Sequence, residues 1–153
     1  MLQNALEDLR ISVWLCKDAD IVRHVHKVVC SLPTQMKFKI GITEDPEWRY
    51  YEAPYAYTLA KYKERDGVQY EGMILVLVHP VRDVVAAFET CLINKYKEDI
   101  LHKSRIANIK VDFDDHIRYD DSDEETEHGA GPHCLYIVYG ESAPKWRSNA
   151  GGR

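Results

Sequence analysis

A carboxylate on an otherwise apolar helix face is the first feature of this sequence that suggests chemistry. Glu89 falls in the periodic segment 82–96, and a helical projection places it inside the apolar arc, one turn after Val85. Burying a carboxylate is costly unless a cation, hydrogen bonds or a metal ion compensates. Glu89 therefore needs a partner of one of these kinds, and the alternative is a carboxylate at the margin of the arc that pairs with Arg82 on nearly the same face.

Arg49 is the second candidate, because the sequence predicts it near the start of a short helix that follows the strand 37–43. Asp45 is suited to cap that helix. An arginine beside the free backbone N–H groups of a helix N-terminus is well placed to bind a phosphate. The alternative is a surface ion pair with Glu47 or Glu52.

Hydrophobic patterning predicts the elements that position these two residues. Residues 37–43 alternate cleanly, as expected of a strand with one buried face, and a short helix follows to about Pro54. Residues 73–78 are apolar on both faces, which is typical of the central strand of a covered sheet. The segment 82–96 has a continuous apolar stripe and is the clearest helix in the chain.

Further segments predict the rest of the sheet. Residues 55–63 alternate and lead through the Asp-Gly pair at 66–67 to 73–79, so we expect two strands around a turn. Residues 11–16 and 134–139 are further candidate strands.

The stretch 20–32 has apolar residues three and four positions apart, which favours a helix capped by Asp18 or Asp20. Its end, 28–30, also fits a strand. The fold expected from all these segments is α/β (α+β), with a small mixed sheet flanked by helices.

Length and composition are those of one globular domain. Of 153 residues, 45% are hydrophobic and 29% are charged, which excludes collagen-like, low-complexity and wholly disordered proteins. The longest apolar run, 73–78, is far too short to span a membrane, and the N-terminus lacks a secretory pattern. We therefore expect an intracellular protein, cytoplasmic or nuclear, without a membrane partner. The four cysteines form no C-x-x-C pair and are expected to be buried thiols.

Charge is distributed unevenly along the chain. Residues 112–128 carry nine carboxylates and one arginine, a local balance of −8, whereas the remainder carries 19 basic and 16 acidic side chains, or +3. We expect a single domain from residues 1–111 and 132–143, an acidic, mobile loop at 112–131, and a flexible tail at 144–153. The acidic segment could mimic DNA charge, bind cations or shield a basic face, or serve only as a solubilising linker.

Two adjoining segments resemble a motif of the GIY-YIG nuclease domain. Residues 38–43, Phe-Lys-Ile-Gly-Ile-Thr, and residues 45–49, Asp-Pro-Glu-Trp-Arg, resemble the second motif of that family and the arginine-bearing helix after it. Arg49 lies eight positions after Gly41, as the family pattern expects.

A later part of the chain extends the resemblance. Residues 73–78 and the helix with Glu89 are similar to the third strand and the glutamate-bearing helix of the family, so that the likeness covers a core at about 28–97. The resemblance implies hydrolysis of nucleic-acid phosphodiesters with one divalent metal ion, Mg²⁺ or Mn²⁺. Glu89 would hold the metal ion, and Arg49 would stabilise the phosphate charge of the transition state.

The chain departs from the family pattern at the tyrosines. The second motif normally has a tyrosine two residues before its glycine, where this chain has Lys39, and the first motif should end in a tyrosine, which 28–32 lacks. Lys39 could contact phosphate, but it could not replace a tyrosine without a strongly lowered pKa. Tyr50 is our candidate for the missing tyrosine, in a group of neighbours that could otherwise be half-buried structural residues. The others in that group are Tyr51, Tyr55 and Tyr57.

Basic residues near these motifs suggest the partner. Lys39, Lys61, Lys63 and Arg65 are expected to contact nucleic acid, DNA rather than RNA, although such residues can also form only a solvated face. The function expected is a metal-dependent endonuclease, with catalysis intact or impaired by the missing tyrosines. The alternatives are a non-catalytic nucleic-acid-binding module and a protein-interaction module that uses the acidic segment.

Overall fold

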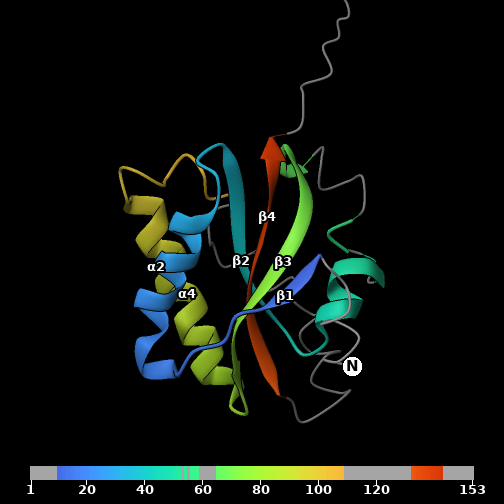
Figure 1. The fold of residues 1–153 in the computed structure, drawn as a ribbon. Helices are drawn as coiled ribbons and strands as arrows, with labels where there is room; N and C mark the ends of the chain where they lie inside the picture. Colours follow the sequence, from blue (N-terminus) through green and yellow to red (C-terminus); the bar gives the residue numbers. More distant parts are fainter. Residues whose placement is uncertain (1–9, 53, 55, 59–64, 109–131, 143–153) are drawn as a thin grey trace, which may run out of the picture.

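The structure is a computed structural model, and it describes residues 10–52, 54, 56–58, 65–108 and 132–142 (Figure 1). These residues form one mixed four-stranded sheet with helices on both of its faces. The expected α+β class is therefore confirmed. The acidic segment 112–131 and the tail 144–153 lie outside the described residues.

The described helices and strands follow the predicted order closely. In chain order they are β1 (Ile11–Val13), η1 (Asp18–Asp20), α2 (Ile21–Ser31), β2 (Met36–Thr43), η2 (Trp48–Glu52), β3 (Val68–His79), α4 (Arg82–Glu98) and β4 (His133–Ser142). The strand predicted at 37–43, the helix at 82–96 and the late strand at 134–139 are confirmed. The ambiguous stretch 28–30 is the last part of helix α2.

The sheet has the strand order β1-β3-β4-β2. β4 is the last described strand of the chain, yet it lies between β3 and β2 and is antiparallel to both. β1 is parallel to β3 at the other edge. Because β4 bonds to both neighbours, the register of the sheet brings residues near position 40 beside residues near position 137.

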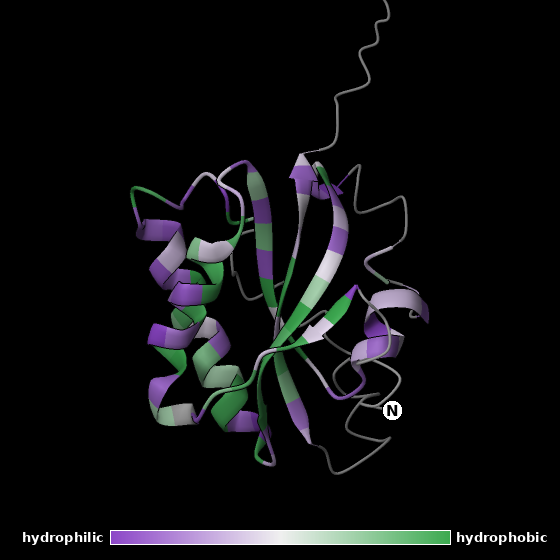
Figure 2. Cartoon of the chain, in the orientation of Figure 1, coloured by the Kyte–Doolittle hydropathy of each residue, from purple (hydrophilic) through white to green (hydrophobic). Residues whose placement is uncertain are grey.

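Two hydrophobic cores lie on opposite faces of this sheet. The helix-side core packs α2 and α4 against one face, and the η2-side core packs η2 and the residues after it against the other. Alternating residues of β4 enter different cores, with Ile137 in the first and Val138 in the second. Figure 2 shows mostly hydrophobic residues where the strands cross and mostly hydrophilic ones on the outer turns of the helices.

The outer edge of β2 is covered by a short segment that follows α4. The backbone of Phe38 donates to the Arg105 carbonyl at 2.9 Å and accepts from the N–H of Ala107 at 2.7 Å. The amide side chain of Asn108 bonds to both the N–H and the carbonyl of Ile40. These bonds satisfy backbone groups that an exposed edge strand would leave open.

Two expectations about the chain were wrong. Within the described part of 55–63, Tyr57 and Thr58 form a turn instead of a strand, and the N–H of Thr58 donates to the carbonyl of Tyr50. The cysteines are not all buried, because Cys30 and Cys91 lie on the outer faces of their helices and are exposed. The buried positions of these two helices are occupied by larger apolar side chains, and the two cysteines fall outside the buried stripe.

Candidate functional site

The pairing of β2 with β4 places a tyrosine directly over Gly41. Gly41 is the register partner of Tyr136, and a Cβ atom at position 41 would overlap the Tyr136 hydroxyl group. The absence of a side chain at Gly41 therefore allows the Tyr136 ring to cross β2 on the η2 side of the sheet. The sequence does not indicate Tyr136 as a site residue, because it lies in an apolar strand segment far from the predicted motifs.

Tyr136 meets a second buried tyrosine. Its hydroxyl lies 2.5 Å from the hydroxyl of Tyr57, which belongs to the turn after η2. The Tyr57 ring packs edge-on against Tyr136 and also against Tyr70 of β3, with ring centroids 5.7 Å and 5.1 Å apart. Three separate segments of the chain thus hold this pair of hydroxyl groups in place.

Arg49 lies beside the ring of Tyr57. Asp45 caps the helical turn as predicted, because its Oδ1 accepts from the N–H of Trp48 at 3.1 Å. This turn directs Arg49 towards Tyr57, and the guanidinium carbon lies 4.4 Å from the ring centroid. A guanidinium at this distance over an aromatic face is held by a cation–π interaction.

Lys39 approaches the tyrosines from β2. Its side chain is 12% exposed, and its Nζ lies 3.5 Å from Oδ2 of Asp66, a fully buried carboxylate that also accepts from the Tyr70 hydroxyl at 2.6 Å. Burial lowers the pKa of Lys39 to about 8; the Asp66 charge opposes this shift, and the charges of Arg65 and Arg49 add to it. We call Lys39, Arg49, Tyr57 and Tyr136 the tyrosine–cation site.

Glu89 belongs to α4, which packs against the other face of the sheet. Burial raises the pKa of its carboxyl group to about 7, while the charges of Arg82 and Lys39 lower it. Between Glu89 and Arg82 the structure shows no ion pair within 4.0 Å, and the part of the chain that it describes contains no hydrogen bond to this carboxylate. Glu89 is therefore a desolvated carboxylate without a close partner in the described residues.

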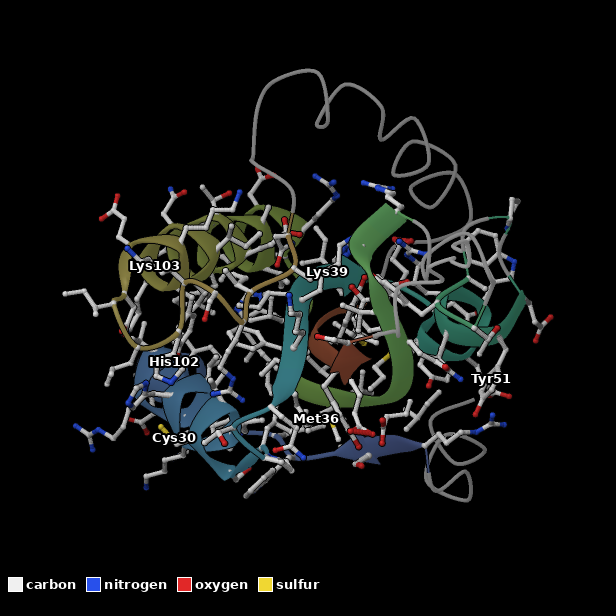
Figure 3. All side chains as sticks on the ribbon, turned by 90° about the horizontal axis from the view of Figure 1, so that it is seen from above. Cys30, Met36, Lys39, Tyr51, His102 and Lys103 are labelled. Atoms are coloured by element: carbon white, nitrogen blue, oxygen red, sulfur yellow. The ribbon has the colours of Figure 1, made fainter. Side chains whose placement is uncertain are left out.

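Arg49 and Glu89 belong to elements on opposite faces of the sheet. η2 packs against one face and α4 against the other, and Figure 3 shows Lys39 on β2 between them. The charge of Lys39 acts on Glu89, and the charge of Arg49 acts on Lys39. The structure therefore does not bring Arg49 and Glu89 together in one pocket, and only the charge of Lys39 acts on Glu89 from the tyrosine–cation site.

The remaining predicted site residues have different positions. Tyr50 is 1% exposed and packs in the η2-side core against the ring of Tyr51. Arg65 is about half exposed, and its Nε lies 3.7 Å from Oδ1 of Asp66. Lys61 and Lys63 lie outside the described residues.

The site belongs to an α+β protein in which Tyr136 lies over a strand glycine and against Tyr57, and two cations lie near the Tyr57 ring. Comparisons of this chain with protein-family models, with curated proteins and with solved structures found no match. Within the described residues, no helix is long and apolar enough to cross a membrane. The function must therefore be argued from the site itself.

Proposed function

We propose that this chain is a GIY-YIG-like metal-dependent endonuclease. The observation that supports the proposal most is Tyr136, whose hydroxyl lies over Gly41 and against Tyr57, beside the stacked guanidinium of Arg49. The resemblance requires a tyrosine on the strand that precedes Gly41, and the segment 28–32 has none. In this chain the strand paired with Gly41 is β4, so Tyr136 would fill that role from a later position in the sequence.

The tyrosine–cation site supplies groups suited to phosphodiester hydrolysis. Arg49 and protonated Lys39 carry positive charge that would bind the scissile phosphate and stabilise the charge that develops in the transition state. The paired hydroxyls of Tyr57 and Tyr136 would orient the attacking water and accept its proton through a hydrogen-bonded relay. Asp66 keeps the Lys39 ammonium directed towards Tyr57, whose ring centroid lies 5.9 Å from Nζ.

Glu89 suits a divalent cation through its chemistry. It is a hard oxygen donor, desolvated and without a close cation in the described part of the chain. No group of three or more histidine, cysteine or acidic side chains in that part could enclose a metal ion. Mg²⁺ accepts a single carboxylate, since it keeps several waters and binds substrate phosphate. When bound, Mg²⁺ or Mn²⁺ would supply Lewis-acid stabilisation of the phosphate charge.

The decisive experiment is a cleavage assay with DNA and RNA substrates in Mg²⁺ or Mn²⁺. We expect cleavage by the wild-type protein and a loss of about 100-fold or more in Arg49→Ala, Glu89→Gln and Tyr136→Phe. Lys103→Ala, a change at an exposed position, is the matched control and should leave the rate unchanged. The proposal fails if the wild type cuts none of the substrates, or if the three site variants cut at the wild-type rate.

A non-catalytic nucleic-acid-binding module is the second candidate. It is favoured by Lys39, because a cation stands where the second motif has a tyrosine and the pair of cations alone would suffice to hold phosphate. This candidate predicts nucleic-acid binding that weakens steeply with salt, without turnover in any metal. Metal-dependent cleavage that disappears in Glu89→Gln would exclude it.

A further inference from the structure

A cysteine on the outer face of α2 has a histidine within hydrogen-bond distance. Cys30 is exposed, and its Sγ lies 3.5 Å from Nε2 of His26, one helical turn earlier. The thiolate is the reactive form of cysteine, and a neighbouring imidazole can accept the thiol proton. This pair lies on the helix side of the sheet, away from the tyrosine–cation site (Figure 3).

The imidazole of His26 is held by a third group. Its Nδ1 lies 3.2 Å from the hydroxyl of Tyr96 on α4, and the two rings are nearly parallel. Burial raises the pKa of Tyr96, so its hydroxyl stays neutral and can accept from Nδ1–H. In the tautomer that carries the proton on Nδ1, this nitrogen donates to the Tyr96 hydroxyl, and Nε2 is an acceptor that faces the sulfur. In this arrangement Cys30 is the nucleophile, His26 is the base that accepts its proton, and Tyr96 orients the base.

Two further buried side chains border this group. His102 is 7% exposed and packs edge-on against both His26 and Tyr96. Its buried Nδ1 lies 3.4 Å from Oδ2 of Asp99 and has no hydrogen-bond partner in the described part of the chain.

Arg105 adds a fixed positive charge near the sulfur. Its guanidinium donates to the carbonyls of Met36 and Pro33 at 3.0 Å and 3.1 Å. Burial lowers the pKa of Arg105, and the charge of Cys30 opposes this shift, so the two groups lie within electrostatic range of each other.

A surface hollow of 440 Å³ begins at His26. It lies between α2 and α4, and its lining includes the basic side chains Arg23 and Lys95 against one acidic side chain, Asp20. The complete lining is Ala19, Asp20, Val22, Arg23, His26 and Lys95. A small molecule with carboxylate groups would match the two cations, and Cys30 lies one helical turn beyond His26, outside this lining.

We propose that Cys30 is a histidine-activated thiol that exchanges with small anionic disulfides. The thiol proton passes to Nε2 of His26, and the Cys30 sulfur attacks one sulfur of the disulfide. A new S–S bond forms as the disulfide bond breaks, and the leaving thiolate takes the proton from His26. Cys30 is oxidised and the small disulfide is reduced. This site would act independently of the proposed nuclease site.

The first test uses the full-length protein and its second exposed thiol as an internal control. Cys91 lies on α4, and the described residues include no histidine within hydrogen-bond distance of it. We expect oxidised glutathione at pH 7 to modify Cys30 about tenfold or more faster than Cys91, measured by mass spectrometry of the separate peptides. In His26→Gln this advantage should fall to about twofold or less. If oxidised glutathione modifies Cys30 and Cys91 of the wild-type protein at equal rates, the proposal is wrong.

The second test examines the charge of the hollow. Cystamine is a cationic disulfide, and we expect it to show a smaller preference for Cys30 over Cys91 than oxidised glutathione shows. Arg23→Gln combined with Lys95→Gln should lower the glutathione rate at Cys30 by about fivefold and leave its rate with neutral iodoacetamide unchanged. If the paired substitution leaves the glutathione rate unchanged, the anionic specificity is wrong.

Discussion

At the scale of single residues, the lowered pKa of Lys39 has a consequence for phosphate binding. With a pKa of about 8, Lys39 is mostly a cation at pH 7 and mostly a neutral amine at pH 9. We expect the affinity for a labelled DNA oligonucleotide, measured by fluorescence anisotropy, to fall by up to about tenfold between these values.

Lys39→Arg is the control for this prediction. An arginine stays charged at both pH values, so the variant should lose the pH dependence and bind at pH 9 about as well as at pH 7. A wild-type affinity that is the same at pH 7 and pH 9 would contradict a role for Lys39 in phosphate binding.

Glu89 makes a second prediction at this scale, for stability. Its pKa in the folded protein, about 7, lies above the ordinary value of 4.5, so the folded state binds more protons between these values. Stability should therefore fall as the pH rises from about 4.5 through 7, by about 1–3 kcal/mol after allowance for partial exposure. Urea unfolding at pH 5 and pH 8 measures the change, and Glu89→Gln should lack this contribution.

Metal binding can be tested on the same samples without an activity assay. If Mg²⁺ binds the ionised Glu89 carboxylate, it should raise the unfolding free energy of the wild type at pH 8 and leave Glu89→Gln unchanged. An equal effect of Mg²⁺ on both proteins would place the ion elsewhere.

At the scale of elements, the segment that covers β2 is a defined source of stability. Asn108 makes two hydrogen bonds to the backbone of Ile40, at 2.9 Å and 3.0 Å. Asn108→Ala would leave both backbone groups without these partners, and we expect a loss of about 1–3 kcal/mol in urea unfolding. Ser104→Ala, an exposed change in the same connection, should alter stability by less than about 0.5 kcal/mol. Similar losses of unfolding free energy in the two variants would show that the Asn108 hydrogen bonds to β2 do not stabilise the protein.

At the scale of the whole molecule, the sheet is shared by two cores, which should make them unfold together. Ile137 of β4 is fully buried in the helix-side core, and Leu75 of β3 is fully buried in the η2-side core. Truncating either residue to alanine should cost about 2–5 kcal/mol. Far-ultraviolet circular dichroism and tryptophan fluorescence should follow one common transition in both variants. Separate transitions would mean that each face of the sheet folds independently.

Much of the local structure could be predicted from the sequence, because local patterns determine it. The alternation at 37–43 and the apolar stripe at 82–96 gave the correct elements, and Asp45 caps its helical turn as expected. The position of Glu89 within an apolar arc can also be recognised from the sequence. Periodicity failed at 55–63, where alternating residues belong to a turn in the part that the structure describes.

The candidate site could be predicted only in part, because strand pairing decides it. Nothing in the order of residues shows that β4 lies beside β2, so the contact between Tyr136 and Tyr57 and the position over Gly41 appear only in the folded chain. The burial of Asp66 against Lys39 is equally non-local. Periodicity and capping act over one or two turns and can be recognised in sequence, whereas pairing and desolvation depend on the fold of the entire chain. Local patterns therefore define most of the elements and the charges they carry, whereas the complete fold is needed to show which of those charges meet.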